Sequence, residues 1–428
     1  MKLSIHVLPI LGFLLFIFLF PYLPIQDYPD WLHQGMLFNQ LVFHPDTFNN
    51  FYSLQGFIPP NGISTLLIGL FTLIIPIEIA GKIFVFATLL LLYCSLNIYF
   101  KRFSLLPKMF AAYCSFYLVF NVFFFMGALN FLFGLGLCFF GFHFFTKRDY
   151  SRATSILLLM LFFFLCYLSH LFAVFIFALF LLSYCISEKK YTLLINAAIG
   201  LIPTIIAFFQ YYASRTPPPY VIESFLKNQT SLLLSRPTNF SIIIPFHRFK
   251  EVTILPAYLK VIDVLTIGIA VLLVIVTIYV IIKTRRIDHR ALSLFLFVIP
   301  LMLMPYSLGG LNFGAERFVI PIIICSLAYC SSLITKQIVF RLATYAMIAV
   351  AVVSLSYNIY NSYVFNTMIT SNRIPTIVED SLFAQKEGVS PFLHFSQYDA
   401  MRTNASVPIF NTGLFTYRAV DSIEIKKH

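Results

Sequence analysis

Two carboxylates, Asp27 and Asp30, lie three residues apart in the stretch QDYPDWLHQG, directly after the first apolar run of the chain. A carboxylate at an apolar boundary loses hydration, which raises its pKa and lets it accept a proton near neutral pH. The pair is therefore a candidate general base. The alternative is a solvated turn that caps the next helix, since aspartate is a favoured N-cap residue. We expect Asp30 to be the cap and Asp27 to be the base.

A second candidate pair is Glu316 and Arg317, which follow the glycine-containing stretch YSLGGLNFGA and open a predicted helix. An arginine beside a helix N-terminus can hold a phosphate through charge-assisted hydrogen bonds and backbone donors. The alternative is an ordinary interfacial arginine paired with its neighbouring glutamate, and the sequence leaves both open.

Basic side chains also gather in the segment 213–258, although we predict this segment on the outer side, where basic residues are usually sparse. An anionic ligand such as a lipid phosphate would explain them, and so would the tendency of long loops to cross regardless of charge. The candidates for donor binding here are Arg236, His247 and Arg248. Candidates for an acceptor contact or a structural role are Trp31, an interfacial anchor by type, with His33, His170 and Asn130.

The elements that must position these residues are membrane helices. Of the 428 residues 60% are hydrophobic and 11% charged, against about 25% charged in soluble domains. Many apolar runs approach the roughly 20 residues that cross a bilayer, where only a helix satisfies its own backbone. We therefore predict an all-α polytopic membrane protein. Its net charge of +12 fits lysine and arginine gathered on the cytoplasmic side, and no nucleic-acid motif is present.

The positions of the charges predict a topology. Helix one, 5–24, runs from inside to outside, and the short segment 63–78 stays at the outer face, so that the following helix ends inside at Lys101 and Arg102. The count is about eleven crossings, with the N-terminus cytoplasmic and the C-terminus outside. The later helices are expected at 107–125, 129–146, 153–169, 171–187, 192–212, 259–282, 291–306, 317–334 and 341–360.

This topology divides the chain into a membrane module, 1–360, with outer loops at 25–80 and 213–258, and a small outer domain, 361–428. All seven cysteines lie in apolar runs without zinc spacing, so neither a disulfide-stapled domain nor a metal site is predicted. Ionisable residues are almost absent from the middle of the helices, which argues against an ion-coupled transporter or a charge-lined channel. Oligomeric state is not predicted.

The order of these features resembles the GT-C superfamily of integral membrane glycosyltransferases that use polyprenyl-phosphate sugars. The matching stretches are QDYPDWLHQG, NGISTLLIGLFTLIIPIEIAGK and the run that ends in YFKRF, with FFFMGALNFLFGLGL similar to a later helix region and AERF to a late outer turn. The resemblance implies that Asp27 deprotonates the acceptor and that Arg317, or a basic residue of 213–258, holds the lipid phosphate. Many relatives carry a second acid where FFFMGALNF has only Asn130. Without it, the divalent metal that the resemblance would allow has no support.

We therefore expect a membrane glycosyltransferase in a bacterial cytoplasmic membrane, acting at the outer face on a glycan, lipid or protein acceptor. Its partners would be membrane lipids and the polyprenyl-phosphate sugar donor. The alternative is a non-enzymatic protein with a degenerate fold of this type, such as a component of lipid or polysaccharide translocation or assembly.

Overall fold

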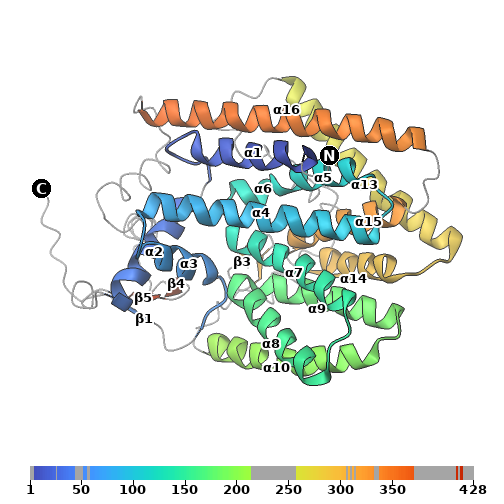
Figure 1. Cartoon of the computed structure of the whole chain (residues 1–428), viewed down its shortest axis with the longest axis horizontal. Coiled ribbons are helices and arrows are strands. Elements are labelled where there is room, and N and C mark those ends of the chain that lie inside the picture. Colours follow the sequence, from blue (N-terminus) through green and yellow to red (C-terminus); the bar gives the residue numbers. More distant parts are fainter. Residues whose placement is uncertain are drawn as a thin grey trace, which may run out of the picture.

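The computed structural model describes residues 4–25, 27–43, 52–54, 58–213, 257–304, 307–308, 311–312, 315–331, 337–370, 411–412 and 415–417. Helices account for most of these residues (Figure 1). The first eight are α1 (Ser4–Phe18), α2 (Tyr28–Phe43), α3 (Ile63–Phe71), α4 (Ile77–Phe103), α5 (Lys108–Val119), α6 (Val122–Phe125), α7 (Leu129–Lys147) and α8 (Arg152–Ser169). They are followed by α9 (Leu171–Ser187), α10 (Tyr191–Ala213), α13 (Ala257–Thr284), α14 (His289–Leu303), the 3-10 helix η4 (Ala315–Phe318), α15 (Val319–Ser331) and α16 (Gln337–Thr370).

Six of the described helical stretches, one of them α5 and α6 taken together, are long and apolar enough to cross a membrane, which marks the chain as an integral membrane protein. They comprise 77–103, 108–125, 152–169, 191–213, 338–364 and 129–147. Four shorter apolar helices, at 5–18, 171–187, 268–284 and 289–303, accompany them.

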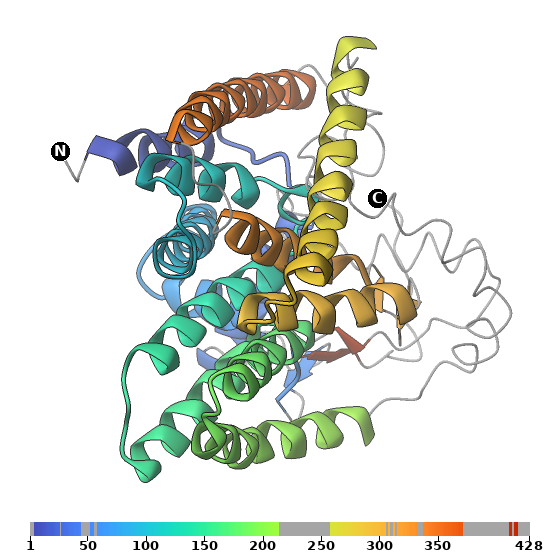
Figure 2. The same ribbon diagram turned by 90° about the vertical axis from the view of Figure 1, so that its right-hand side faces the viewer.

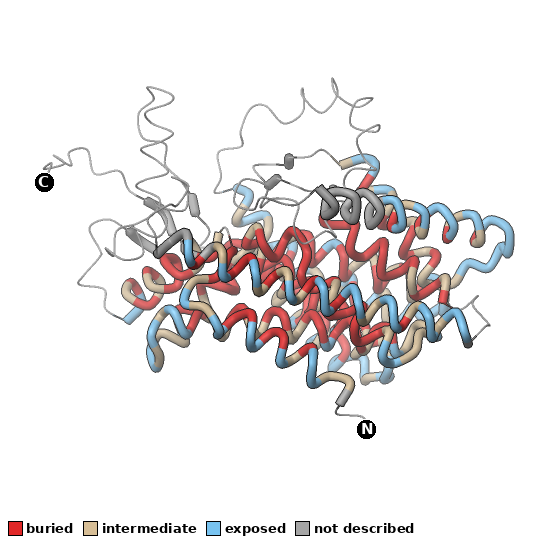
Figure 3. Tube along the Cα trace, turned by 90° about the horizontal axis from the view of Figure 1, so that it is seen from above, coloured by how far each residue is buried: buried red, intermediate tan, exposed pale blue. Residues whose placement is uncertain are grey.

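The helices lie in successive layers. Helix α16 packs on α1 and α5, α4 packs on α7, α7 packs on α8 and α9, and α10 packs on α8. Helices α16 and α10 accordingly lie at opposite sides of the bundle in both views (Figures 1 and 2). Buried residues concentrate in the central helices, while the outer helices carry exposed strips (Figure 3).

Basic turns gather at one end of the bundle. Arg102 at the end of α4 donates to His143 O at the end of α7 (2.8 Å), and Lys190 before α10 pairs with Asp149 before α8 (3.2 Å). Arg290 at the start of α14 donates to Phe103 O and Ala328 O (2.8 and 3.0 Å). These contacts join the turns 104–107, 148–151, 188–190 and 285–288, which we call the basic end.

The opposite end carries the candidate carboxylates. The side chain of Asn366, late in α16, accepts from Tyr22 N and donates to Tyr22 O after α1 (3.1 and 2.9 Å). The indole of Trp31 donates to Gly127 O, between α6 and α7 (2.7 Å). We call this the Asp27 end.

The core of the bundle is built largely from phenylalanine. Phe13 and Phe16 of α1 contact Phe120, at ring-centroid distances of 5.7 and 5.3 Å, in tilted or edge-to-face arrangements. Close helix approach relies on small residues, as is usual in membrane bundles. A Cβ added to Gly136 of α7, for example, would lie 3.1 Å from Leu92 N of α4.

Most helices lie close to their predicted bounds, but the structure corrects several. Helix α1 ends at Phe18 instead of 24, because Pro21 disfavours helical backbone in the residues before it. The predicted helix 107–125 is broken at Phe120 and Asn121, where the Asn121 side chain accepts from Phe124 N and starts α6. The predicted helix 317–334 opens as η4 and ends at Ser331, and α16 continues past 360 to Thr370.

Short strands were not predicted. Strands β1 (Tyr52–Leu54), β4 (Asn411–Thr412) and β5 (Phe415–Tyr417) form an antiparallel sheet in the order β1–β5–β4, with Ser53 opposite Thr416. This sheet joins the C-terminal segment to the region between α2 and α3 (Figure 1). Strands β2 (Ser307–Leu308) and β3 (Leu311–Asn312) form an antiparallel pair before η4.

Candidate functional site

Asp27 and Asp30 lie at the start of α2. The helix begins at Tyr28, and Trp31 N donates to Asp27 O at 3.3 Å, so Asp27 takes the N-cap position and Asp30 lies inside the first turn. The expectation that Asp30 caps the helix is therefore wrong. The physical reason is Pro29. The N–H groups of the first helical turn have no intrahelical acceptor, so a proline there costs no hydrogen bond and the helix can start before it.

Asp30 has the electrostatics of a general base. It is partly buried, and the loss of hydration raises its pKa to about 7, with the charge of Asp27 as the second cause. A carboxyl group with this pKa is partly ionised at neutral pH and can take up or release a proton there. Asp30 is thus the acid whose pKa is raised toward neutrality, and Asp27 is the neighbouring charge.

Gly127 holds the N-terminus of α2 in place. Its φ of +84° belongs to the left-handed region, which favours glycine. A Cβ there would lie 2.6 Å from Asp27 Cβ and 2.7 Å from Asp27 N. Because Trp31 also donates to Gly127 O, the turn between α6 and α7 contacts α2 through both backbone and side chain.

Asn130, in the first turn of α7, fastens the start of α3. Its amide nitrogen donates to Asn61 O at 2.8 Å and its amide oxygen accepts from Ser64 N at 2.9 Å. An aspartate could accept but could not donate. The absence of an acid at this position is therefore explained by a structural role, the second of the two roles expected for Asn130.

Arg317 lies in a box of aromatic rings. Its guanidinium carbon lies 4.9 Å from the ring centroid of Phe131, 5.3 Å from that of Phe123 and 5.5 Å from that of Phe172. Burial lowers its pKa to about 10, against the opposing effect of Glu316, so the side chain remains a cation at neutral pH. Glu316 is buried beside it in η4, and the pair opens α15 as predicted.

His170 shares that box and separates α8 from α9. Its Nδ1 accepts from Phe172 N at 3.1 Å, which caps α9, and its ring meets Phe131 edge-on at 5.5 Å. Burial, and then the charge of Arg317, hold its pKa well below the usual range, so the imidazole is neutral. These contacts give His170 the structural role that the sequence left open.

The sequence analysis did not identify several polar residues of the Asp27 end. On α2, the Gln34 side chain accepts from the Thr65 hydroxyl of α3 at 3.0 Å. Lys82, one turn inside α4, donates to Phe20 O at 2.7 Å and brings a cation to this end. The sequence held a signal for Gln34, which follows Asp30 by four residues and therefore shares its helix face.

His33 is buried on α2 beside Asp30. Burial lowers its pKa to about 4, and its Nε2 has no hydrogen-bond partner in the structure. The imidazole is therefore neutral at pH 7.

The segment from Phe123 to Phe131 connects the two candidate pairs. Gly127 touches Asp27 and Trp31, Asn130 touches α3, and Phe123 and Phe131 contact Arg317. Residues about 290 positions apart in the chain thus meet across one short segment at the Asp27 end. Arg236, His247 and Arg248 lie outside the described residues. Within the described part of the chain, no three His, Cys, Asp or Glu side chains form a group that could hold a metal ion.

No model of a known protein family, no curated protein and no solved structure matches this chain.

Proposed function

We propose that the chain is an integral membrane glycosyltransferase of the GT-C type, with about eleven crossings, which moves a sugar from a polyprenyl phosphate to an acceptor hydroxyl. The observation that supports this most is the partly ionised Asp30 beside Asp27, at one end of a bundle of apolar helices. In the proposed orientation the basic end is cytoplasmic and the Asp27 end faces the outside, as the distribution of lysine and arginine favours.

In the proposed reaction Asp30 accepts the proton of the acceptor hydroxyl. The freed oxygen attacks the anomeric carbon of the donor sugar and forms the new glycosidic bond. The bond from that carbon to the phosphate oxygen breaks, and its electron pair leaves with polyprenyl phosphate. Attack opposite the leaving group inverts the anomeric carbon. General base catalysis of this kind contributes typically 10²–10⁴-fold.

Asp27 acts on this reaction through Asp30. Its negative charge is the second cause of the raised pKa, which matches the base to neutral pH. Gly127 and Trp31 fix the first turn of α2 and with it the separation of the two acids. Asp27 is therefore a positioning and tuning residue in this proposal.

The leaving phosphate needs positive charge nearby. Arg317 supplies a buried cation behind the aromatic rings of Phe123, Phe131 and Phe172, and low-dielectric surroundings strengthen its field. Arg236, His247 and Arg248 remain candidates for direct contact with the phosphate. The polyprenyl tail would lie along the apolar helix surfaces.

The test uses the full chain in lipid vesicles, with membranes of the expressing cells as acceptor. Short-chain polyprenyl phosphates that carry labelled glucose, mannose, galactose or aminoarabinose are supplied in turn, and released polyprenyl phosphate is measured. We expect release with one donor, and a loss of at least about 100-fold in Asp30→Asn. Glu188→Gln, an exposed carboxylate at the basic end, is the matched control and should retain activity.

Two results would count against the proposal. Full activity in a folded Asp30→Asn variant would remove the assigned base. Absence of release with every donor would favour the non-enzymatic alternative, a component of lipid or polysaccharide translocation. The orientation is tested separately, since a reporter fused after Lys101 should report the cytoplasm.

A further inference from the structure

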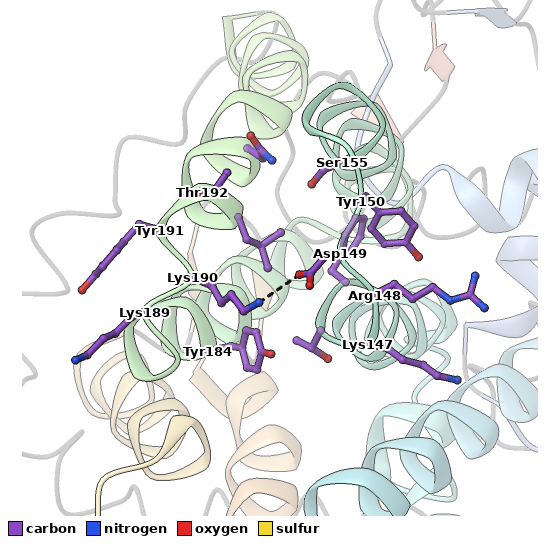
Figure 4. A pocket seen from close by; sticks show the side chains of 14 residues that line it. Lys147, Arg148, Asp149, Tyr150, Ser155, Tyr184, Lys189, Lys190, Tyr191 and Thr192 are labelled. Carbon is purple, nitrogen blue, oxygen red and sulfur yellow. Dashed lines mark hydrogen bonds and ion pairs between the residues drawn. The ribbon is translucent and has the colours of Figure 1, made fainter.

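A cavity of about 380 Å³ lies at the basic end, far from the Asp27 end along the helices, between the turn from α7 to α8 and the turn from α9 to α10 (Figure 4). Its lining includes Asp149, Ser155, Tyr184, Lys190, Thr192 and Asn196. The volume falls within the range of about 300–1,000 Å³ usual for small-molecule sites.

Positive charge dominates this cavity. Four of its lining residues are cations (Lys147, Arg148, Lys189 and Lys190) and one, Asp149, is an acid. Lys190 points across the cavity to Asp149, at 3.2 Å, whereas Arg148 and Lys189 point outward in opposite directions (Figure 4). Lys190 is thus the cation that reaches the interior, and the other three add to the surrounding potential.

One helix N-terminus also lies at the cavity. Tyr191, Thr192 and Leu193 form the first turn of α10, and Ser155 of α8, whose own N–H donates to Ser151 O at 2.8 Å, lines the cavity as well. The first N–H groups of a helix lack intrahelical acceptors and carry partial positive charge, which favours an anion. The chemistry of the cavity is therefore that of an anion site.

Asn196 provides an independent indication of a ligand. It lines the cavity, it is 4% exposed, and its Oδ1 has no hydrogen-bond partner in the structure. Buried amide oxygens are normally paired. A ligand that satisfies this oxygen has to bring a hydrogen-bond donor as well as a negative charge.

The flanks of the cavity indicate where such a ligand comes from. Leu157 and Leu161 of α8 and Tyr191 and Ile195 of α10 are exposed apolar side chains on the two helices that begin there. In a membrane these surfaces face acyl chains. A phosphate ester that has an acyl tail would bury apolar surface here as well as pairing its charge, which a free phosphate ester could not do.

We propose that this cavity binds the headgroup of an anionic phospholipid that carries a hydroxyl group beside its phosphate. The phosphate pairs with Lys190 and the N-terminus of α10, and the headgroup hydroxyl donates to Asn196 Oδ1. The acyl chains lie along α8 and α10. Asp149, whose side chain is exposed, competes with the phosphate for Lys190, so binding exchanges this surface ion pair for one with the lipid.

The test titrates the purified full chain in detergent with phosphatidylglycerol and follows thermal unfolding, because a ligand that binds only the folded state raises the melting temperature. Phosphatidylcholine and free glycerol phosphate are the comparison probes. We expect protection by phosphatidylglycerol and none by the other two. Equal protection by glycerol phosphate would overturn the assignment to a lipid.

Four variants make the test specific. We expect Asn196→Leu and Lys190→Gln each to weaken binding roughly tenfold, the effect of losing one hydrogen bond or charge pair. Asp149→Asn should strengthen binding, since it removes the competitor. Lys108→Gln, an exposed lysine at the same end outside the cavity, should bind as the wild type does.

Asn196→Leu has a second readout that a purely structural asparagine would not produce. Because it removes an unpaired buried oxygen, the lipid-free variant should melt no lower than the wild type. Lys190 is half-exposed, so Lys190→Gln tests the site without disturbing the interior. Unchanged phosphatidylglycerol affinity in both variants, or weaker binding in Asp149→Asn, would overturn the proposal.

Discussion

The backbone of Asp27 lies directly against Gly127, so closely that a single added Cβ at Gly127 would come within 2.7 Å of the Asp27 nitrogen. Gly127 has a positive φ, and its carbonyl accepts the Trp31 indole N–H. The position of the two candidate catalytic acids is therefore set by a glycine that is 100 residues away in the chain. This contact links α2, which carries the acids, to the segment whose rings hold Arg317.

Gly127→Ala should displace the first turn of α2. The added methyl group meets backbone atoms of Asp27, and its φ is unfavourable for alanine, so we expect a loss of about 1–3 kcal/mol in stability. Thermal unfolding and donor turnover check this. Gly268→Ala is the matched control, because a Cβ on that helical glycine meets nothing within 4 Å. Equal losses of stability in Gly127→Ala and Gly268→Ala would contradict the close contact between Gly127 and Asp27.

Asn130→Asp should loosen α3 from α7. The substitution keeps the acceptor for Ser64 N and loses the donor to Asn61 O, and it buries a carboxylate. We expect a loss of about 2–4 kcal/mol at neutral pH, measured by thermal unfolding. A variant as stable as the wild type at pH 8 would show that the amide donor is unimportant.

Arg290→Lys should destabilise the basic end. Arg290 donates to the last carbonyls of α4 and α15, Phe103 O and Ala328 O, and it pairs with Asp288. A lysine cannot reproduce this fork of donors, so we expect a loss of about 2–4 kcal/mol. Arg286→Lys, exposed in the same turn, should change the melting temperature little. Wild-type stability in Arg290→Lys would contradict the role of the Arg290 guanidinium as donor to Phe103 O and Ala328 O.

Asp30 should make stability depend on pH. Its folded pKa of about 7 exceeds the value of about 4 for an unfolded aspartate. Between these values the folded state holds a proton that the unfolded state has lost, so stability falls as pH rises. Asp30→Asn removes this loss. Its free energy of unfolding at pH 8 should exceed that of the wild type by about 1–2 kcal/mol after allowance for partial exposure. The difference should be smaller at pH 5 and should vanish below about pH 4, where both states of the wild type are protonated.

The sequence predicted the helices well where local signals are strong. The short apolar segment predicted at 63–78 contains the nine-residue helix α3, 63–71. Basic residues lie at the ends of α4 and α7, as predicted. These features follow from apolar length and charge position, both of which are local. Asp27 and Asp30 became candidates for the same reason, because they directly follow an apolar run, and their catalytic role stays a prediction.

Features that depend on contacts between distant segments could not be predicted. The start of α2 before Pro29 and the burial of Asp30 are two such features. The box around Arg317 joins rings from α6, α7 and α9. Strand β1 pairs with β5, which lies more than 350 residues later. No local sequence pattern indicates which distant segments will pair in this way.

The most direct measurement of the central claim is the pH dependence of polyprenyl phosphate release in the wild type and in Asp27→Asn. The wild-type rate should rise with pH, reach half its maximum near pH 7 and level off above it, because the base has to be ionised. In Asp27→Asn the loss of the neighbouring negative charge should lower the pKa of Asp30 and move the midpoint to lower pH. An unchanged midpoint, or one that moves to higher pH, would contradict Asp30 as the base that Asp27 tunes.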